Sequence, residues 1–201
     1  MDKMKNGAVL RNGTQRTAKE VFEKYAIVIA FLALLIVVSI LCSSFLTPSN
    51  LILVLNQTSI NGILAVGITY VLITAGIDIS IGSVVGLSGV ISAMVVKAGA
   101  PLPVGFLCGI LAGTLVGVII GILVTKGKLA PYIVTLGFLT IIRGAALLIA
   151  GGRPISSLGD AYGWIGNHNV FGVIPCPVII FLIVVVIGHI ILAHLQIGRY
   201  I

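Results

Sequence analysis

The side chain in this sequence that most suggests chemistry is the carboxylate of Asp78. It lies in the stretch 74–89, TAGIDISIGSVVGLSG, and no other acidic residue occurs between Glu23 and Asp160. Long apolar runs flank the stretch, and a carboxylate among them is costly unless a partner compensates its charge. The neighbouring glycines and serines allow a helix to break or two backbones to approach closely. This combination indicates a polar break inside a membrane protein, and therefore a transport function.

Two compatible roles are open for Asp78. In a structural role, the carboxylate caps the helix that follows by accepting hydrogen bonds from the amide of Ser80 or Ile81. In a functional role, Asp78 and Ser80 line a gate or a translocation path, where the carboxylate pairs with a cation.

Arg143 is the second charged residue inside an apolar run. It lies about 11 residues into that run, or roughly 16 Å along a helix axis, which is near the middle of a bilayer. A buried arginine is expensive and seldom without a function, so we expect Arg143 to be buried and paired. A shifted helix boundary would instead let it reach the interface. Because Asp78 is the only acidic candidate within the apolar runs, an ion pair between residues 78 and 143 is a hypothesis.

A cluster of neutral polar residues occupies the second apolar run. Amides and hydroxyls of this kind both donate and accept hydrogen bonds, which suits a hydroxyl-rich solute. They also suit plain hydrogen bonding between helices, and the sequence leaves both roles open. The candidates for the translocation path in this cluster are Asn56, Gln57, Thr58, Ser59 and Asn61.

The sequence indicates no catalytic residue and no metal site. His189 and His194 are five residues apart, about 140° around a helix, so we expect them not to share a face. The cysteines match no metal or redox spacing, and the sequence contains neither a G-x-x-x-x-G-K-[ST] loop nor a G-x-S-x-G motif. We therefore expect no enzymatic activity and no cofactor on this chain. If ATP drives transport, another subunit hydrolyses it.

The composition places these residues in a membrane. Hydrophobic residues make up 59% of the 201 residues and charged residues only 8%, whereas soluble proteins average about 25% charged. The net charge is +7, and half of the twelve Lys and Arg residues lie within residues 1–24. Beside a membrane span, such a basic tail indicates a cytoplasmic anchor rather than a nucleic-acid-binding segment.

The sequence predicts an all-α polytopic membrane protein. A span needs about 20 mostly apolar residues, and spans this apolar must be helices because lipid cannot satisfy backbone polar groups. The first run is too long for a signal peptide. A transmembrane domain over residues 25–201 is expected to contain six spans, at 25–46, 51–75, 80–98, 102–124, 132–150 and 173–195.

The distribution of Lys and Arg predicts the orientation. With the N-terminus inside, Lys97 and Arg153 are the only basic residues in outer segments, and all others outside the spans are cytoplasmic. Both ends of the chain are then cytoplasmic. In the longest outer loop, 151–172, Tyr162 and Trp164 are expected to rest at the membrane interface as aromatic anchors.

Glycines at a spacing of four predict close helix packing in the fourth span, because small residues let two helices touch backbone to backbone. Gly82, Gly86 and Ser83 give the third span a similar face. The stripe in the fourth span consists of Gly105, Gly109, Gly113, Gly117 and Gly121.

Three stretches of this sequence carry a family resemblance. They are NQTSINGILAVG at 56–67 with AGIDISIGS at 75–83, PYIVTLG at 131–137 with IRG at 142–144, and GRYI at 198–201. On these motifs the chain resembles the permease subunits of bacterial ABC importers for monosaccharides, of the ribose, xylose and galactose type. Asp78 and Arg143 both fall on matching motif positions.

The resemblance implies the N-terminal part of a roughly ten-helix permease in a bacterial plasma (inner) membrane. It implies a translocation path for a monosaccharide, with ribose as the first expectation. A second permease copy, identical or different, and an ATPase subunit pair carrying ATP and Mg would complete the importer, together with a periplasmic or extracellular sugar-binding protein. The G-R-Y motif would lead into the loop that docks on the ATPase. The chain stops there, so we expect a fragment or a truncated product.

Two other interpretations remain open. A secondary transporter driven by an ion gradient would use a membrane-buried acidic residue and a broken helix, which Asp78 and its glycines match in part. A membrane scaffold without transport activity is suggested only by the glycine stripe.

Overall fold

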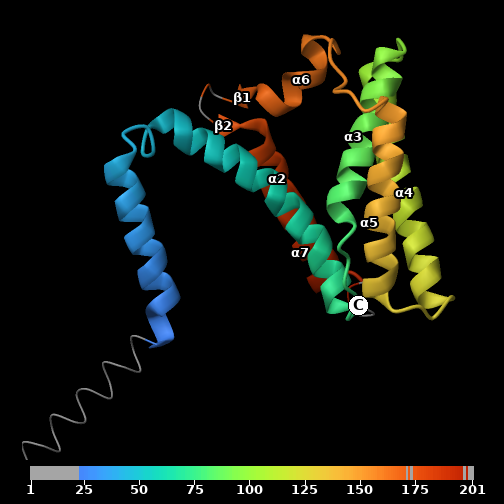
Figure 1. Cartoon of the computed structure of the whole chain (residues 1–201), viewed down its shortest axis with the longest axis horizontal. Helices are drawn as coiled ribbons and strands as arrows, with labels where there is room; N and C mark the ends of the chain where they lie inside the picture. The colour runs from blue at the N-terminus through green and yellow to red at the C-terminus, as the bar shows by residue number, and fades with distance from the viewer. Residues whose placement is uncertain (1–22, 171, 173, 197, 199–201) are drawn as a thin grey trace, which may run out of the picture. The chain divides into compact units, whose positions relative to one another are not determined.

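The computed structural model describes residues 23–170, 172, 174–196 and 198. Helices dominate the described chain (Figure 1), which confirms the all-α polytopic prediction. Most of the basic tail 1–24 and the G-R-Y motif beyond Gly198 lie outside the described residues. The chain divides into two units, Met1–Leu53 and Val54–Ile201.

The first unit contains one long apolar helix, Glu23–Leu41, and the start of α2. This helix ends five residues before the predicted boundary at residue 46. The residues that follow form turns instead, because Thr47 donates its hydroxyl to the carbonyl of Ser44 at 2.7 Å. The Thr47 oxygen also accepts from the amide of Asn50 at 3.4 Å, which caps the next helix.

Five helices are long and apolar enough to cross a membrane: Glu23–Leu41, α2 (Pro48–Ile73), α4 (Leu102–Thr125), α5 (Pro131–Ala150) and α7 (Cys176–His194). Proline stands in the first turn of the last four, where its missing N–H costs nothing. The predicted third span corresponds to α3 (Ile81–Lys97), which has 17 residues. At 1.5 Å per residue α3 is about 26 Å long, slightly less than the hydrocarbon thickness of about 30 Å.

Helices α3, α4 and α5 form a three-helix bundle in the second unit (Figure 1). Its core lies where the three helices meet and is filled by branched aliphatic side chains, with Phe138 packed against them. The buried members are Leu87, Val116, Ile120, Val134 and Ile142.

The glycine stripe of α4 contacts α3 over part of its length. A Cβ added at Gly105 would collide with Val96, one at Gly109 would lie 2.8 Å from the Ser88 carbonyl, and one at Gly113 would lie 2.9 Å from the Ser88 hydroxyl. The last two members of the stripe, Gly117 and Gly121, have open space beside them. The glycines therefore allow close contact between α3 and α4 only along the N-terminal half of α4.

Helices α2 and α7 pack against each other through glycines and aromatic rings. The ring of Phe181 lies against Gly62, so closely that a Cβ there would meet it at 2.5 Å. Near the other end of the pair, the Tyr70 hydroxyl donates to the carbonyl of Gly188 at 2.7 Å. Each glycine thus accommodates an aromatic side chain of the opposite helix.

The predicted loop 151–172 contains regular structure that the sequence analysis did not foresee. Gly151 adopts φ 66° and ends α5, and Gly159 at φ 78° leads into the short helix α6 (Asp160–Asn167). Strand β1 (Asn169–Val170) then pairs antiparallel with β2 (Ile174–Pro175), just before α7. These strands have two residues each, so they shape the connection and form no sheet core.

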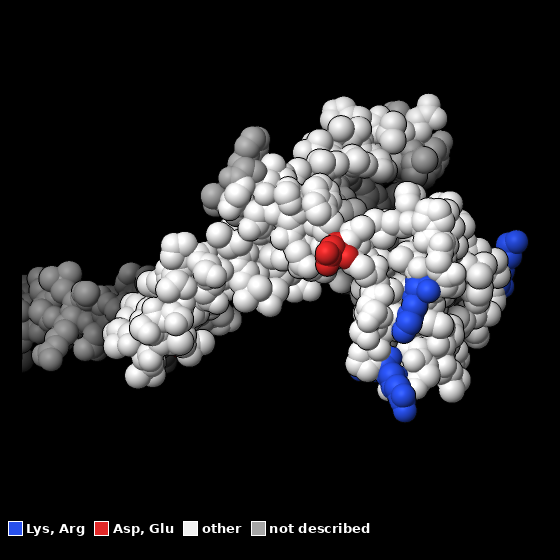
Figure 2. All heavy atoms as spheres, turned by 90° about the horizontal axis from the view of Figure 1, so that it is seen from above, with Lys and Arg blue, Asp and Glu red and all other residues white. Residues whose placement is uncertain are grey.

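The surface of the described chain is mainly apolar. Large aliphatic side chains on every long helix are exposed, among them Ile27, Leu53, Ile110, Ile133 and Val186. On the face drawn in Figure 2, charged residues are a few isolated spots. Such a surface is suited to lipid and to other apolar helices.

Candidate functional site

The chain breaks its helical structure between α2 and α3. Helix α2 ends with the amide of Gly76 bonded to the carbonyl of Val71 at 2.9 Å and that of Ala75 to Leu72 at 3.0 Å. This is a Schellman pattern, and Ala75 takes the left-handed conformation, φ 57°, that glycine usually occupies there. Residues 76–80 then run without helix or strand.

Asp78 holds this break together through Ser80. Its Oδ1 accepts from the Ser80 amide at 2.8 Å and from the Ser80 hydroxyl at 2.7 Å. The expected bond to the Ser80 amide is present, but Ser80 occupies the N-cap position of α3. Asp78 therefore stabilises the turn before the cap, as Asp does in Asx-turns, and Ser80 is completely buried.

The break lies at the level of the first turns of α5. Thr135, which is 1% exposed, has its hydroxyl 3.3 Å from the Ile77 carbonyl and 2.9 Å from the Pro131 carbonyl. Ser83 donates to the Leu139 carbonyl at 2.9 Å. These contacts place the start of α3 about 6–12 Å along α5. Irregular backbone at such depth is tolerated only where protein or a water-filled cavity satisfies it.

A cavity of about 720 Å³ opens beside the break, between α3 and α5. On α3 it is lined by Gly82, Gly86 and Gly89, three glycines without a neighbour within 4 Å of a built Cβ. The expected packing of Gly82 and Gly86 against another helix is thus wrong for the described chain. Ser88 and Ser92, on another side of α3, pack on α4, and the glycines leave the cavity open.

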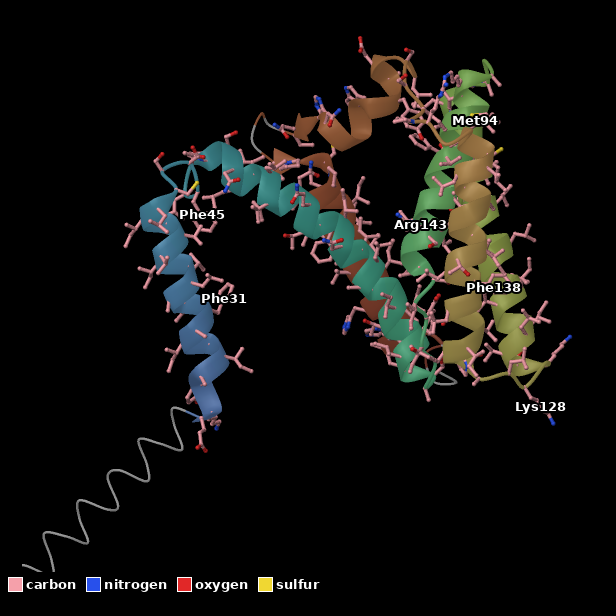
Figure 3. The ribbon with its side chains drawn as sticks, in the orientation of Figure 1. Phe31, Phe45, Met94, Lys128, Phe138 and Arg143 are labelled. Carbon is pink, nitrogen blue, oxygen red and sulfur yellow. The ribbon has the colours of Figure 1, made fainter. Side chains whose placement is uncertain are left out.

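Arg143 lies in this cavity on the α5 side, between Met94 and Lys128, which mark the two ends of the bundle (Figure 3). It is exposed, and within the described part of the chain no ion pair joins it to Asp78. The expectation of a buried, paired arginine is therefore wrong here. The carboxylate of Asp78 accepts hydrogen bonds from Ser80 instead. The guanidinium of Arg143 is exposed in the cavity.

The other charged residue of the cavity is Arg153, which follows the end of α5. Tyr162 from α6 covers the same end: its hydroxyl lies 3.5 Å from the Gly89 carbonyl and its ring is 5.7 Å from that of Phe106. The cavity is thus mainly apolar along its walls, and its side-chain hydrogen-bond donors are two guanidinium groups, one phenol and the Ser83 hydroxyl, which already donates to Leu139. The interfacial position of Tyr162 stays a prediction.

The neutral polar cluster of α2 divides between two faces of the helix. Ser59 is buried and bonds within α2 to the Leu55 carbonyl at 2.7 Å, while Asn56 donates to the Gly166 carbonyl at 3.4 Å. The remaining members of the cluster, Gln57, Thr58 and Asn61, are exposed. None of the cluster lines the cavity beside Arg143, so its part in a translocation path stays a prediction.

The two histidines of α7 approach each other more closely than their spacing predicted. The rings of His189 and His194 are 6.0 Å apart at 75°, because His194 is the last residue of the helix and both side chains are long enough to reach around it. Both are exposed. The rings therefore approach each other although their positions are about 140° apart around the helix, and two rings do not make a metal site by themselves.

Comparison with known proteins identifies the family. Residues 50–201 match the family described as "Branched-chain amino acid transport system / permease component". The chain belongs to this family. The match includes the break at Asp78, all of the α3–α5 bundle and α6.

Curated relatives are similar over most of the chain. It is 41% identical over 180 residues to the ribose import permease protein RbsC of Bacillus subtilis, covering 89% of this chain and 56% of the relative. It is 36% identical over 177 residues to RbsC of Escherichia coli K12, covering 86% and 55%. The D-allose transport system permease protein AlsC of Escherichia coli K12 is 33% identical over 183 residues, covering 89% and 55%.

This chain therefore spans about half the length of the curated relatives it matches. No solved structure matches it significantly.

Proposed function

We propose that this chain forms part of the translocation path of an ABC importer for a neutral monosaccharide. The observation that carries the proposal is the cavity between α3 and α5, with Arg143 in it, in a chain 41% identical to a ribose import permease. A guanidinium offers several N–H donors, which suit sugar hydroxyls, and three glycines leave room for a solute beside it. The relatives named for ribose and allose support an aldose, with ribose as the first candidate.

In this proposal, a separate partner subunit supplies the energy for transport. The sequence lacks a phosphate-binding G-x-x-x-x-G-K-[ST] loop, so ATP and Mg would be bound by a separate ATPase subunit. A sugar-binding protein would deliver the solute, and a second permease copy would complete the path. Alternating access would then follow from ATP-driven movement of the helices.

The proposed orientation has the N-terminus in the cytoplasm. Lys126 and Lys128, between α4 and α5, would face the cytoplasm, and α6 would face the outside. The break at Asp78 would then lie toward the cytoplasmic side, where α5 begins.

Uptake of labelled D-ribose tests the proposal in a host strain that lacks its own copy of this gene. The native gene should restore uptake. Arg143→Gln should reduce it by about tenfold, equivalent to about 1.4 kcal/mol, while Arg143→Lys should retain part of it because a cationic donor remains. Membrane levels of each variant, measured by immunoblot, separate transport defects from loss of the protein.

The energy source is tested in the same cells. Uptake that stops on ATP depletion and survives an ionophore agrees with the proposal. The reverse pattern would replace it with an ion-driven transporter. If deletion of the gene changed the uptake of no sugar, only a structural role would remain for this chain.

A further inference from the structure

A second cavity lies on α6, away from Arg143. It measures about 420 Å³ and is lined by Gly159, Asp160, Gly163, Trp164, Asn167 and His168. The Trp164 and His168 rings are stacked, with centroids 4.4 Å apart and planes at 18°. Trp164 is nevertheless 56% exposed.

The sequence of α6 places these residues on one face. Asp160, Gly163, Trp164 and Asn167 follow the spacing i, i+3, i+4, i+7 of a single helical stripe. Gly163 leaves the space that the Asn167 side chain uses, since a Cβ there would lie 3.0 Å from its Nδ2. We call the group Asp160, Trp164, Asn167 and His168 the α6 cradle.

The opposite face of α6 holds it to the rest of the unit. Tyr162 packs on Phe106 and reaches the Gly89 carbonyl, and the Gly166 carbonyl accepts from Asn56. Tyr162 and Gly166 lie about 200° and 240° around the helix from Asp160. The cradle therefore faces away from the contacts that anchor the helix, so its polar groups are free to meet a ligand.

The chemistry of the cradle suits a neutral polyhydroxylated ring. A flat aromatic surface accepts the C–H face of a sugar, while its edge remains polar. The Asp160 carboxylate accepts hydrogen bonds from hydroxyls, and the Asn167 amide both donates and accepts. No Lys or Arg lines the cradle, and the carboxylate would repel an anion. These groups distinguish a free sugar from a phosphorylated one.

We propose that the α6 cradle is a binding subsite for a neutral monosaccharide, separate from the cavity of Arg143. The choice of a sugar as ligand rests on the proposed function. Tyr162 lines the Arg143 cavity while Trp164 lines the cradle, so α6 stands between the two. A sugar released at this end of the bundle would meet the cradle before the cavity.

The tryptophan itself provides the test, because the chain contains one Trp. The purified chain in lipid nanodiscs is titrated with D-ribose and with D-allose while tryptophan emission is recorded. Glycine betaine, a neutral solute without hydroxyls, controls for osmotic effects. We expect a saturable change with at least one sugar and none with betaine.

Variants then assign the response to the cradle. Asp160→Asn and Asn167→Ala should each weaken the apparent affinity at least about fivefold, a loss of about 1 kcal/mol. Asn169→Ala, which changes an exposed residue of β1 that lines neither cavity, should leave the affinity unchanged. Emission maxima and acrylamide quenching without sugar show whether α6 keeps its place in each variant.

Several results would overturn the subsite. They are a linear response, an equal response to betaine, or an affinity unchanged in both Asp160→Asn and Asn167→Ala with α6 in place. D-ribose uptake by the native gene is measured in parallel. Uptake without a fluorescence response rejects the cradle alone, whereas loss of the proposed function appears as absent uptake whatever the fluorescence does.

Discussion

At the scale of single residues, the polar side chains around the break mainly serve the backbone. Asp78 accepts hydrogen bonds from both the amide and the hydroxyl of Ser80, and the hydroxyl of Thr135 lies 3.3 Å from the carbonyl of Ile77. Water is scarce at this depth, so unpaired backbone groups there would be expensive. Asp78 thus has a structural role in the turn before α3.

Substitutions of Asp78 can separate these two roles. Asp78→Asn keeps an Oδ1 acceptor for Ser80, so the free energy of unfolding should change by less than about 0.5 kcal/mol, whereas Asp78→Ala should cost about 1–2 kcal/mol. Thermal unfolding in detergent, followed by circular dichroism, measures both. Equal destabilisation by Asn and Ala would show that the negative charge, rather than the acceptor, holds the turn. Loss of D-ribose uptake in a stable Asp78→Asn protein would identify a functional charge.

At the scale of elements, packing of α3 on α4 depends on where side chains are missing. Gly109 lies against the backbone of α3 at Ser88, whereas Gly117 has nothing within 4 Å of a built Cβ. Lipid gives little hydrophobic drive to helix association, so close contact of small residues contributes much of it. The two glycines occupy the same stripe and differ only in their surroundings, which makes them a matched pair.

Alanine at these two positions should have opposite effects. Gly109→Ala puts a methyl group 2.8 Å from the Ser88 carbonyl and should destabilise the fold by about 1–3 kcal/mol as α3 and α4 are pushed apart. Gly117→Ala should be neutral or stabilise by up to about 1 kcal/mol through helix propensity. The midpoint of thermal unfolding in nanodiscs reports both. A destabilising Gly117→Ala would reveal a neighbour outside the described residues.

At the scale of the whole molecule, the path of the chain through the membrane depends on whether α3 crosses it. Helix α3 has 17 residues, two fewer than the shortest of the five clear span candidates, yet it packs along α4 and α5. If α3 crosses, four crossings precede the α4–α5 connection and Lys128 is on the same side as the N-terminus. If α3 does not cross, Lys128 is on the opposite side.

Labelling of single cysteines decides between the two. The background chain has serine at its three native cysteines, Cys42, Cys108 and Cys176. We expect Arg153→Cys to react with a membrane-impermeant maleimide in intact cells, and both Lys24→Cys and Lys128→Cys to react only after lysis. Labelling of Lys128→Cys in intact cells would contradict a crossing by α3.

Much of this architecture can be predicted from local sequence patterns. Runs of about 20 apolar residues, bounded by Pro48, Pro131 and Gly151, were sufficient to place the long helices within a few residues, apart from the end of the first. The turn at Asp78 and Ser80 could also be predicted, because its hydrogen bonds join residues two apart in the sequence. Hydropathy and short-range hydrogen bonding depend only on neighbours in the chain.

Tertiary structure alone decided which faces meet. Asp78 and Arg143 form no ion pair in the described chain. Gly82 and Gly86 line a cavity, whereas Gly109 packs on Ser88. The loop 151–172 contains the helix that carries the α6 cradle. All apolar faces of a membrane helix look alike in sequence, and lipid accepts each of them. The choice among them comes from steric fit between residues distant in the chain, which no local pattern records.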